Sequence, residues 1–346
     1  MAAVVSGVAI YILLPALVKV FAAWPRFSSL EPVWLVAAVI AEGASFACSI
    51  ALQRLVLRRK EWFPVATASL AGNALTNTLP AGDAAGAGLQ FRMLAAAGID
   101  VDSAAGGLAV SSLLGVGGLL ALPIFSLPAI LGGSQVRPGL VHAALLGLGG
   151  FVLFVVGSVT VLLTDKPLAV AARLIQRLWN ATFGHRARVS GIDRRVLRER
   201  DSLRSTLGRD GWKAVLFVTG RLGFDYLCLL GGLRAAGSAP RPGLVLLAYA
   251  ATGIVALVPI TPGGLGIVEA SLTGMLVLAG VSGGRAVLAT LAYRLASYWL
   301  PLLAGAISYL LFRRRYGRGP LKGPAGRGRF DAGPGGVAVD PRVPRP

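Results

Sequence analysis

The sequence predicts an all-α polytopic membrane protein, and three observations support this fold class. Of the 346 residues, 55% are hydrophobic and 14% are charged, whereas a soluble domain carries about 25% charged residues. The mean hydropathy is +0.70. Apolar stretches about as long as the roughly 20 residues that a helix needs to cross a bilayer recur along most of the chain. These stretches do not alternate apolar and polar residues, which excludes a transmembrane β-barrel.

Six apolar stretches are predicted to be full membrane spans. They are Met1–Ala23, Val33–Leu52, Ser103–Leu131, Gly139–Thr164, Ala214–Gly232 and Ala286–Phe312. The first of them has no basic residues at its start, and its apolar core is longer than that of a secretion signal. We therefore interpret it as the first span.

The net charge of +19 is concentrated in three segments. Gln53–Trp62 is basic, Asp165–Lys213 holds 12 basic and 5 acidic residues, and Arg313–Pro346 holds 9 basic and 2 acidic residues. Cytoplasmic loops carry such an excess, which explains the charge without nucleic-acid binding. We therefore expect a plasma-membrane protein with the N-terminus, the linker 165–213 and the tail in the cytoplasm. Anionic lipid headgroups are the expected partners of the basic loops.

Two apolar regions are interrupted by polar residues and helix breakers. The region Phe63–Gly98 is broken between Asn73 and Asp83, and the region Pro242–Gly280 is broken between Val258 and Gly266. If the basic segments share one side, each region enters and leaves the membrane on the same side. Each is then a re-entrant hairpin or a pair of short spans, giving about eight membrane segments in all. The halves 1–131 and 139–312 then have opposite orientations, as in the inverted repeats of many transporters.

Proline and glycine cause both interruptions. The breakers are Pro80 and Gly82 in the first region, and Pro262, Gly263, Gly264 and Gly266 in the second. A break at membrane depth frees backbone polar groups that lipid cannot satisfy, so it must face protein or a water-filled cavity. The N-terminal ends of broken helices also attract anions. The alternative interpretation is that both breaks are tight turns in connecting loops.

Seven charged residues within or beside the apolar segments are candidate substrate-binding residues. They are Glu42, Asp83, Arg92, Arg221, Asp225, Glu269 and Arg294. Charges at membrane depth are costly and usually functional, and a guanidinium group matches the geometry of phosphate. Two structural alternatives remain open. Arg221 and Asp225 are four residues apart on one predicted helix and can form a salt bridge, and Arg92 can extend to the membrane interface.

Motifs of soluble catalysis are missing from the sequence. It contains no phosphate-binding loop, serine-hydrolase elbow, zinc-protease or dinucleotide motif. Cys48 and Cys228 lie in apolar segments, and neither histidine has ligand-like neighbours. We therefore expect no cofactor, no metal site and no enzymatic activity. The enzymatic alternative is a lipid-linked transferase in which Glu42, Asp83 or Glu269 is the base.

The two broken regions resemble the two signatures of the lysylphosphatidylglycerol synthase transmembrane-region family. The first resemblance is Leu79-Pro-Ala-Gly-Asp83, followed by Arg92-Met-Leu and Gly98. The second is closer in order and spacing. It comprises Val258-Pro-Ile-Thr-Pro-Gly-Gly-Leu-Gly-Ile-Val-Glu269, then Gly280-Val281, Tyr293-Arg294, Tyr298-Trp299-Leu300-Pro301 and Gly305. The resemblance to the family is expected to cover most of residues 1–315.

The resemblance implies a flippase-like domain, over residues 1–315, that binds and translocates a polar lipid, anionic or phosphate-bearing. It also implies that Arg92, Glu269 and Arg294 are pathway residues. In the multiple-peptide-resistance proteins a similar domain precedes an aminoacyl-transferase domain, but none follows Arg315 here, so we expect no synthesis of lysyl-lipid. The tail 316–346 is rich in Gly, Pro and Arg and is predicted to be disordered. The alternative function is a scaffold for a separately encoded glycosyltransferase or aminoacyl-transferase.

Overall fold

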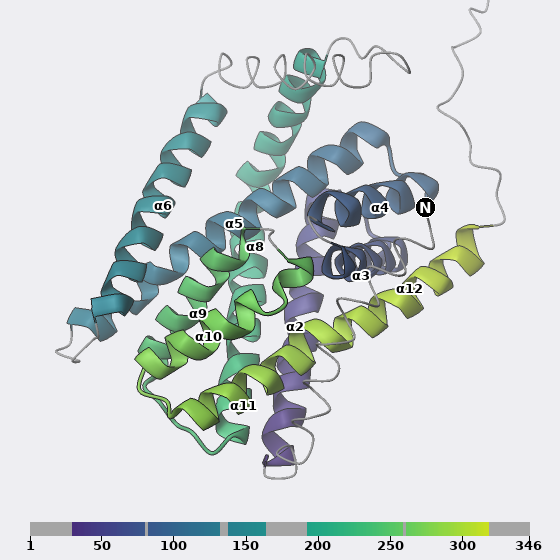
Figure 1. The fold of residues 1–346 in the computed structure, drawn as a ribbon. Coiled ribbons are helices and arrows are strands. Elements are labelled where there is room, and N and C mark those ends of the chain that lie inside the picture. Colours follow the sequence, from purple (N-terminus) through teal and green to yellow (C-terminus); the bar gives the residue numbers. More distant parts are fainter. Residues whose placement is uncertain (1–29, 80–81, 132–137, 164–191, 259–260, 318–346) are drawn as a thin grey trace, which may run out of the picture.

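A computed structural model of the chain describes residues 30–79, 82–131, 138–163, 192–258 and 261–317 (Figure 1). Every regular element in these ranges is a helix. The elements are α2 (Pro32–Val56), α3 (Trp62–Thr78), α4 (Gly82–Ala96), α5 (Val101–Leu131), α6 (Pro138–Leu163), α8 (Ile192–Ala235), α9 (Pro242–Ala256), the 3₁₀ turn η1 (Pro262–Gly264), α10 (Ile267–Leu278), α11 (Gly283–Arg294), the π-helical segment η2 (Leu295–Trp299) and α12 (Leu300–Tyr316).

Four helices in the described ranges are long and apolar enough to cross a membrane. They are Pro32–Val56, Val101–Ser126, Asp210–Ala235 and the continuous helix Gly283–Tyr316 formed by α11, η2 and α12. They coincide with four predicted spans, and α6, with 26 residues, coincides with a fifth. The remaining predicted span, Met1–Ala23, lies outside the described residues. The predicted class, an all-α polytopic membrane protein, is confirmed.

Large apolar side chains cover the outer faces of these helices. Val36 and Ile40 of α2, Leu146 of α6, and Leu303 and Ile307 of α12 are all more than half exposed. Water would penalise such continuous apolar surfaces, whereas acyl chains accept them. The outward faces therefore fit a lipid environment.

The longest interface joins α2 to α8, which run antiparallel. Gly231 lies against Ala38 near one end, and Gly220 lies against the Cys48 sulfur further along. Small residues let the two backbones approach closely, as is typical of membrane helices. The helix α8 begins at Ile192, so residues 192–213 of the predicted linker are helical and continuous with the span. No proline interrupts this stretch, and the rest of the linker, 164–191, lies outside the described residues.

The two interrupted regions form helical hairpins, α3 with α4 and α9 with α10. These four helices contain between 12 and 17 residues, which corresponds to about 18 to 26 Å. The hydrocarbon core is roughly 30 Å thick, so the lengths favour re-entrant hairpins over pairs of full spans.

The two halves of the chain exchange contacts reciprocally. The last span of the first half, α5, packs on α9, and the last span of the second half, α12, packs on α3. Each hairpin thus rests on a span of the opposite half, an arrangement that an inverted repeat produces. The predicted repeat is therefore supported by the helix packing (Figure 1).

Two basic segments lie at the same end of the α3–α12 pair. The guanidinium of Arg315, at the end of α12, lies 4.8 Å from the ring centre of Phe63, near the start of α3. The segment Arg58–Lys60 directly precedes α3 and is exposed. This proximity agrees with the expectation that both basic segments face the same side of the membrane.

Candidate functional site

A cavity of about 730 Å³ lies where the two halves of the chain meet. Helices α2 to α5 line it from the first half, and α8 to α11 with η1 and η2 line it from the second. Much of the wall consists of hydroxyl and amide side chains. They are Ser45, Ser49, Gln53, Ser69, Asn73, Thr76, Asn77, Gln90, Ser111, Ser112, Thr252, Thr261 and Ser297. The cavity is therefore polar although its helices are apolar on the outside.

The two breaks meet at this cavity. The hydroxyl of Tyr298 donates a 2.9 Å hydrogen bond to the carbonyl oxygen of Asn77, near the end of α3. A Cβ atom added to Gly263 in the second break would lie 3.2 Å from the Asn77 Cα. Tyr298 itself is buried near the middle of the continuous helix Gly283–Tyr316. Both hairpins therefore turn at about the middle depth of that span.

Glycine makes the second turn possible. Gly263, Gly264 and Gly266 have φ values of 53°, 69° and 84°, a region that side chains with a Cβ rarely adopt. Pro262 precedes them and is buried. The turn thus lies against protein, as predicted for a break at membrane depth, and not in a connecting loop in solvent.

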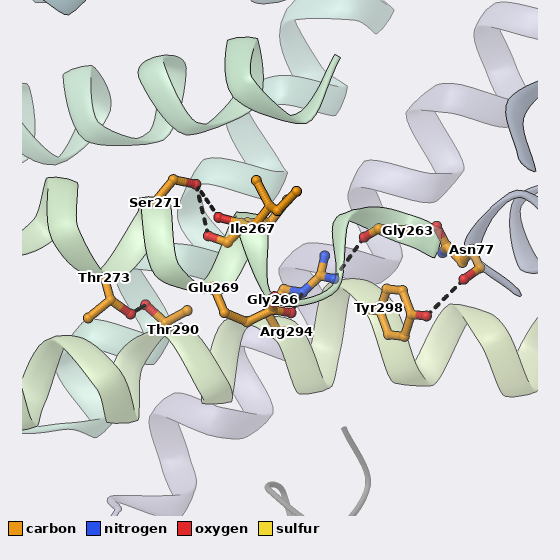
Figure 2. Close-up of polar contacts among 11 residues, drawn as sticks. Asn77, Gly263, Gly266, Ile267, Glu269, Ser271, Thr273, Thr290, Arg294 and Tyr298 are labelled. Carbon is orange, nitrogen blue, oxygen red and sulfur yellow. Dashed lines mark hydrogen bonds and ion pairs between the residues drawn. The ribbon is translucent and has the colours of Figure 1, made fainter. Parts of the chain in front are cut away.

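An ion pair holds the second turn in place (Figure 2). The Nε of Arg294 lies 2.7 Å from Oε1 of Glu269, and its Nη2 donates a 2.9 Å hydrogen bond to the carbonyl oxygen of Gly263. The other carboxylate oxygen of Glu269 accepts a 2.5 Å hydrogen bond from the Gly266 N–H. The guanidinium also lies 4.4 Å from the ring centre of Tyr298. Arg294 directly precedes the π-helical segment, a feature frequent at functional sites.

Asp225 is fixed by two tyrosines. Tyr249 donates a 2.6 Å hydrogen bond to one carboxylate oxygen, and Tyr293 donates a 2.9 Å hydrogen bond to the other. Among the described residues, Asp225 forms no ion pair with Arg221. The Arg221 guanidinium instead approaches α5, where a Cβ added to Gly115 would lie 2.9 Å from Nη1. The structure therefore disagrees with the alternative of a salt bridge within this helix.

Several buried polar atoms of the cavity wall have no hydrogen-bond partner among the residues that the structure describes. They are Oε2 of Glu42, Oγ of Ser111 and Oγ1 of Thr261. Glu42 is only 6% exposed. Buried polar groups in proteins are nearly always paired, so unpaired ones that share a cavity indicate a place for a polar occupant.

The structure brings five of the seven predicted charged residues to the cavity. These are Glu42, Asp83, Arg221, Asp225 and Arg294, and they are joined there by Gly82, Gly263 and Gly264. Glu269, Pro262 and Gly266 lie outside the lining, next to residues that form it. Pro80 lies outside the described residues.

Arg92 is separated from the cavity. Its side chain is exposed and is not part of the lining, because Gln90, Met93 and Leu94 occupy the buried face of α4. This position agrees with the alternative interpretation, in which Arg92 extends to the membrane interface. We therefore do not count it among the residues of the cavity.

Uncharged polar residues of the cavity were not singled out from the sequence. Gln90 donates a 2.7 Å hydrogen bond to Gln53 across α4 and α2, and Asn77 donates a 3.2 Å hydrogen bond to Asn73. Tyr249 and Tyr293 were missed as partners of Asp225. The available signal was the presence of side-chain amides within apolar segments, where they typically bond to neighbouring helices.

Metal binding has little basis in this arrangement. Within the described ranges, no three His, Cys, Asp or Glu side chains gather as a metal site would require. Cys48 and Cys228 are free thiols. The charged groups of the cavity are two arginines and three carboxylates, and hydroxyl and amide side chains surround them.

Comparison with known proteins identifies the family. The chain matches the family described as Lysylphosphatidylglycerol synthase TM region over residues 4–305. The chain belongs to this family. It is thus a multi-pass membrane protein of the Lysylphosphatidylglycerol synthase TM region family, and the resemblance inferred from the two broken regions is confirmed.

Two relatives share shorter stretches with this family member. A UPF0104 membrane protein of Methanothermobacter thermautotrophicus is 31% identical over 90 residues, which is 26% of this chain and 24% of that protein. A UPF0104 membrane protein of Pyrococcus horikoshii is 39% identical over 70 residues, which is 20% of this chain and 21% of that protein. The matched stretches span about a quarter or less of these relatives, whose names give no activity.

Proposed function

We propose that this protein binds a polar lipid, anionic or phosphate-bearing, by its headgroup and carries it across the plasma membrane as a flippase-like transporter. The observation that carries the proposal is the meeting of two broken hairpins at a polar cavity with Arg294 in its wall. Transporters commonly place their substrate sites near the bilayer midplane, between the ends of broken helices.

The size and donors of the cavity support a headgroup as the ligand. Its volume of about 730 Å³ lies within the range of roughly 300 to 1,000 Å³ for small-molecule sites. Arg294 uses Nε and Nη2 for Glu269 and Gly263, which leaves the Nη1 end of its guanidinium for a ligand. Arg221 and Asp83 line the cavity and are also exposed, so the cavity communicates with the protein surface.

A transport role is favoured over the two alternatives. A scaffold for a separate transferase needs docking surfaces but no polar cavity between its halves. In a scaffold, the unpaired atoms of Glu42, Ser111 and Thr261 would have no ligand to bind. An enzyme would need a second substrate or an activating group, and the sequence carries no motif for either. We infer that the chain acts without a cofactor and that its partner is the lipid itself.

We further propose that the N-terminus, the linker and the tail face the cytoplasm. The positive-inside rule supports this orientation, because the segments 53–62 and 313–346 carry a basic excess. The contact of Arg315 with Phe63 adds support, since it brings the two segments together. Anionic headgroups on the cytoplasmic leaflet would then contact the basic loops.

The experiment that tests transport measures lipid exchange in reconstituted vesicles. Phosphatidylcholine vesicles containing a small fraction of fluorescent phosphatidylglycerol are prepared with purified protein, and the outer leaflet is bleached chemically. We expect Arg294→Ala to lower the exchange rate by about tenfold to a hundredfold, because a charged hydrogen bond to a ligand contributes about 1.5 to 3 kcal/mol.

The matched control is Arg92→Ala, which removes an exposed arginine outside the cavity. We expect this variant to exchange lipid within about twofold of the wild type, since surface changes rarely exceed about 0.5 kcal/mol. Equal rates for the wild type, Arg294→Ala and protein-free vesicles would contradict the transport proposal. Loss of exchange in Arg92→Ala alone would contradict the assignment of the cavity.

A further inference from the structure

We propose that Glu42, held beside Asp225, is a proton-binding site that couples lipid movement to a proton gradient. This inference rests on the lipid transport proposed above and names the ion that drives it. Its basis is the position of one buried carboxyl group, which the binding of a headgroup by the arginines does not explain.

Glu42 lies deep within the protein and faces the cavity. The residue is 6% exposed and lines the cavity wall, and its Oε2 has no hydrogen-bond partner within the described ranges. Its carboxyl group interacts with three side chains of α8, those of Asp225, Cys228 and Arg221. A buried carboxylate oxygen with no donor is costly, and a proton removes the charge that causes the cost.

Asp225 differs from Glu42 in the hydrogen bonds that its carboxylate oxygens accept. Both of its oxygens already accept hydrogen bonds from tyrosine hydroxyls, at 2.6 and 2.9 Å. Two carboxyl groups that interact inside a protein do not readily carry two negative charges. Glu42, with its open oxygen, is therefore the member of the pair that gains and loses the proton.

The titratable and charged groups around Glu42 come from several elements. Helix α8 supplies Arg221, Asp225 and Cys228, α9 supplies Tyr249, and α11 supplies Tyr293 and Arg294. Helix α4 adds Asp83 to the same cavity wall, whereas the lining residues from α3 and α5 are uncharged. Arg221 of α8 is the positive group that interacts with Glu42, but it does not form a hydrogen bond with Oε2.

A proton fits this site better than a metal ion. Metal ions such as Ca²⁺ and Mg²⁺ need about six oxygen ligands, and among the described residues no group of three or more His, Cys, Asp or Glu side chains is placed to hold a metal ion. A proton needs a single acceptor atom, and Oε2 of Glu42 supplies it.

Proton binding and headgroup binding then favour one another. Protonation of Glu42 removes one negative charge from a cavity that also holds Arg221 and Arg294, so a lipid anion binds more tightly. By linkage, the bound anion favours protonation of Glu42 to the same degree. The proton enters from solution, binds Oε2, and returns to solution on the other side with the lipid. One proton per singly charged lipid then supports a leaflet ratio of about tenfold for each pH unit.

The test imposes a pH gradient on phosphatidylcholine vesicles that contain fluorescent phosphatidylglycerol and the purified protein, with the membrane potential clamped at zero. In wild-type vesicles we expect the labelled lipid to accumulate in the leaflet on the alkaline side, by about tenfold per pH unit. We expect Glu42→Gln to abolish this asymmetry. Glu31→Gln, an exposed carboxylate beside the start of the same helix, is the matched control and retains it.

The outcomes separate this inference from the transport proposal. If the wild type exchanges lipid but ignores the pH gradient, or follows a sodium gradient instead, the proton site is wrong while transport stands. If the wild type exchanges no lipid, transport itself is contradicted. Infrared spectroscopy then tests the proton site without transport. The wild type and Asp225→Asn should show a carboxylic-acid band that disappears at high pH, and its persistence in Glu42→Gln would overturn the assignment.

Discussion

The two hairpins that meet at the cavity are stabilised in different ways. The first hairpin is held by close helix packing, because Gly86 of α4 lies against the Gly72 carbonyl oxygen and the Thr76 hydroxyl of α3. The second hairpin has a turn of three glycines with positive φ, and the Arg294–Glu269 ion pair fixes that turn. Close packing of α4 on α3 therefore stabilises the first hairpin, and an ion pair stabilises the turn of the second hairpin.

We therefore expect the first hairpin to respond to added side-chain volume and the second hairpin to respond to loss of charge. The packing of α4 on α3 in the first hairpin leaves no room for added volume, since a Cβ on Gly86 would lie 2.5 Å from a backbone oxygen. The turn of the second hairpin depends on charged groups that also border the cavity. A ligand that binds Arg294 would therefore also contact the group that fixes the second turn.

The largest effect is expected from filling the space between α3 and α4. Gly86→Ala forces a methyl group into the Thr76 hydroxyl and the Gly72 carbonyl oxygen, and overpacking of this kind costs about 3 kcal/mol. We expect a large loss of folded protein, measured by thermal unfolding in detergent. Gly88→Ala, on the same helix with open space around its Cα, is the control and should unfold like the wild type. Equal stability of the two variants would contradict the steric account.

A smaller effect is expected from neutralising the second turn. Glu269→Gln leaves Arg294 without its ion-pair partner, and we expect a loss of about 2 kcal/mol, between the values for exposed and buried pairs. Thermal unfolding measures this loss. The double variant Glu269→Leu with Arg294→Met should recover stability, because apolar replacements often match a buried pair, but it should not exchange lipid. Recovered exchange in that variant would mean that the charges are structural only.

The smallest effect is expected where the last span contacts the first hairpin. Tyr298→Phe removes the hydrogen bond to the Asn77 carbonyl oxygen, and such bonds between membrane helices contribute about 0.6 kcal/mol. We expect a small shift of the unfolding transition and nearly normal lipid exchange. Tyr309→Phe, on the exposed face of α12, is the control. A large loss of exchange without a loss of stability would instead place the Tyr298 hydroxyl in the transport pathway.

The close similarity of the second broken region to its family signature made that region the more predictable one. Its Pro-Gly-Gly pattern indicated a break in the helix, and Glu269 and Arg294 were recognisable as charges in apolar surroundings. The first region offered weaker signals, so Arg92 was interpreted as a binding residue although it lies on the exposed face of α4. A single charge beside a break does not reveal which face of the helix it occupies.

The sequence by itself determined the membrane class, the positions of the long spans and the two breaks, because hydropathy and helix breakers act locally along the chain. The partners of the charged residues were decided by the tertiary structure alone. Asp225 binds Tyr249 and Tyr293, which are 24 and 68 residues away, instead of the arginine one turn before it. Which groups meet in a cavity depends on the packing of helices from both halves, and no local pattern encodes that packing.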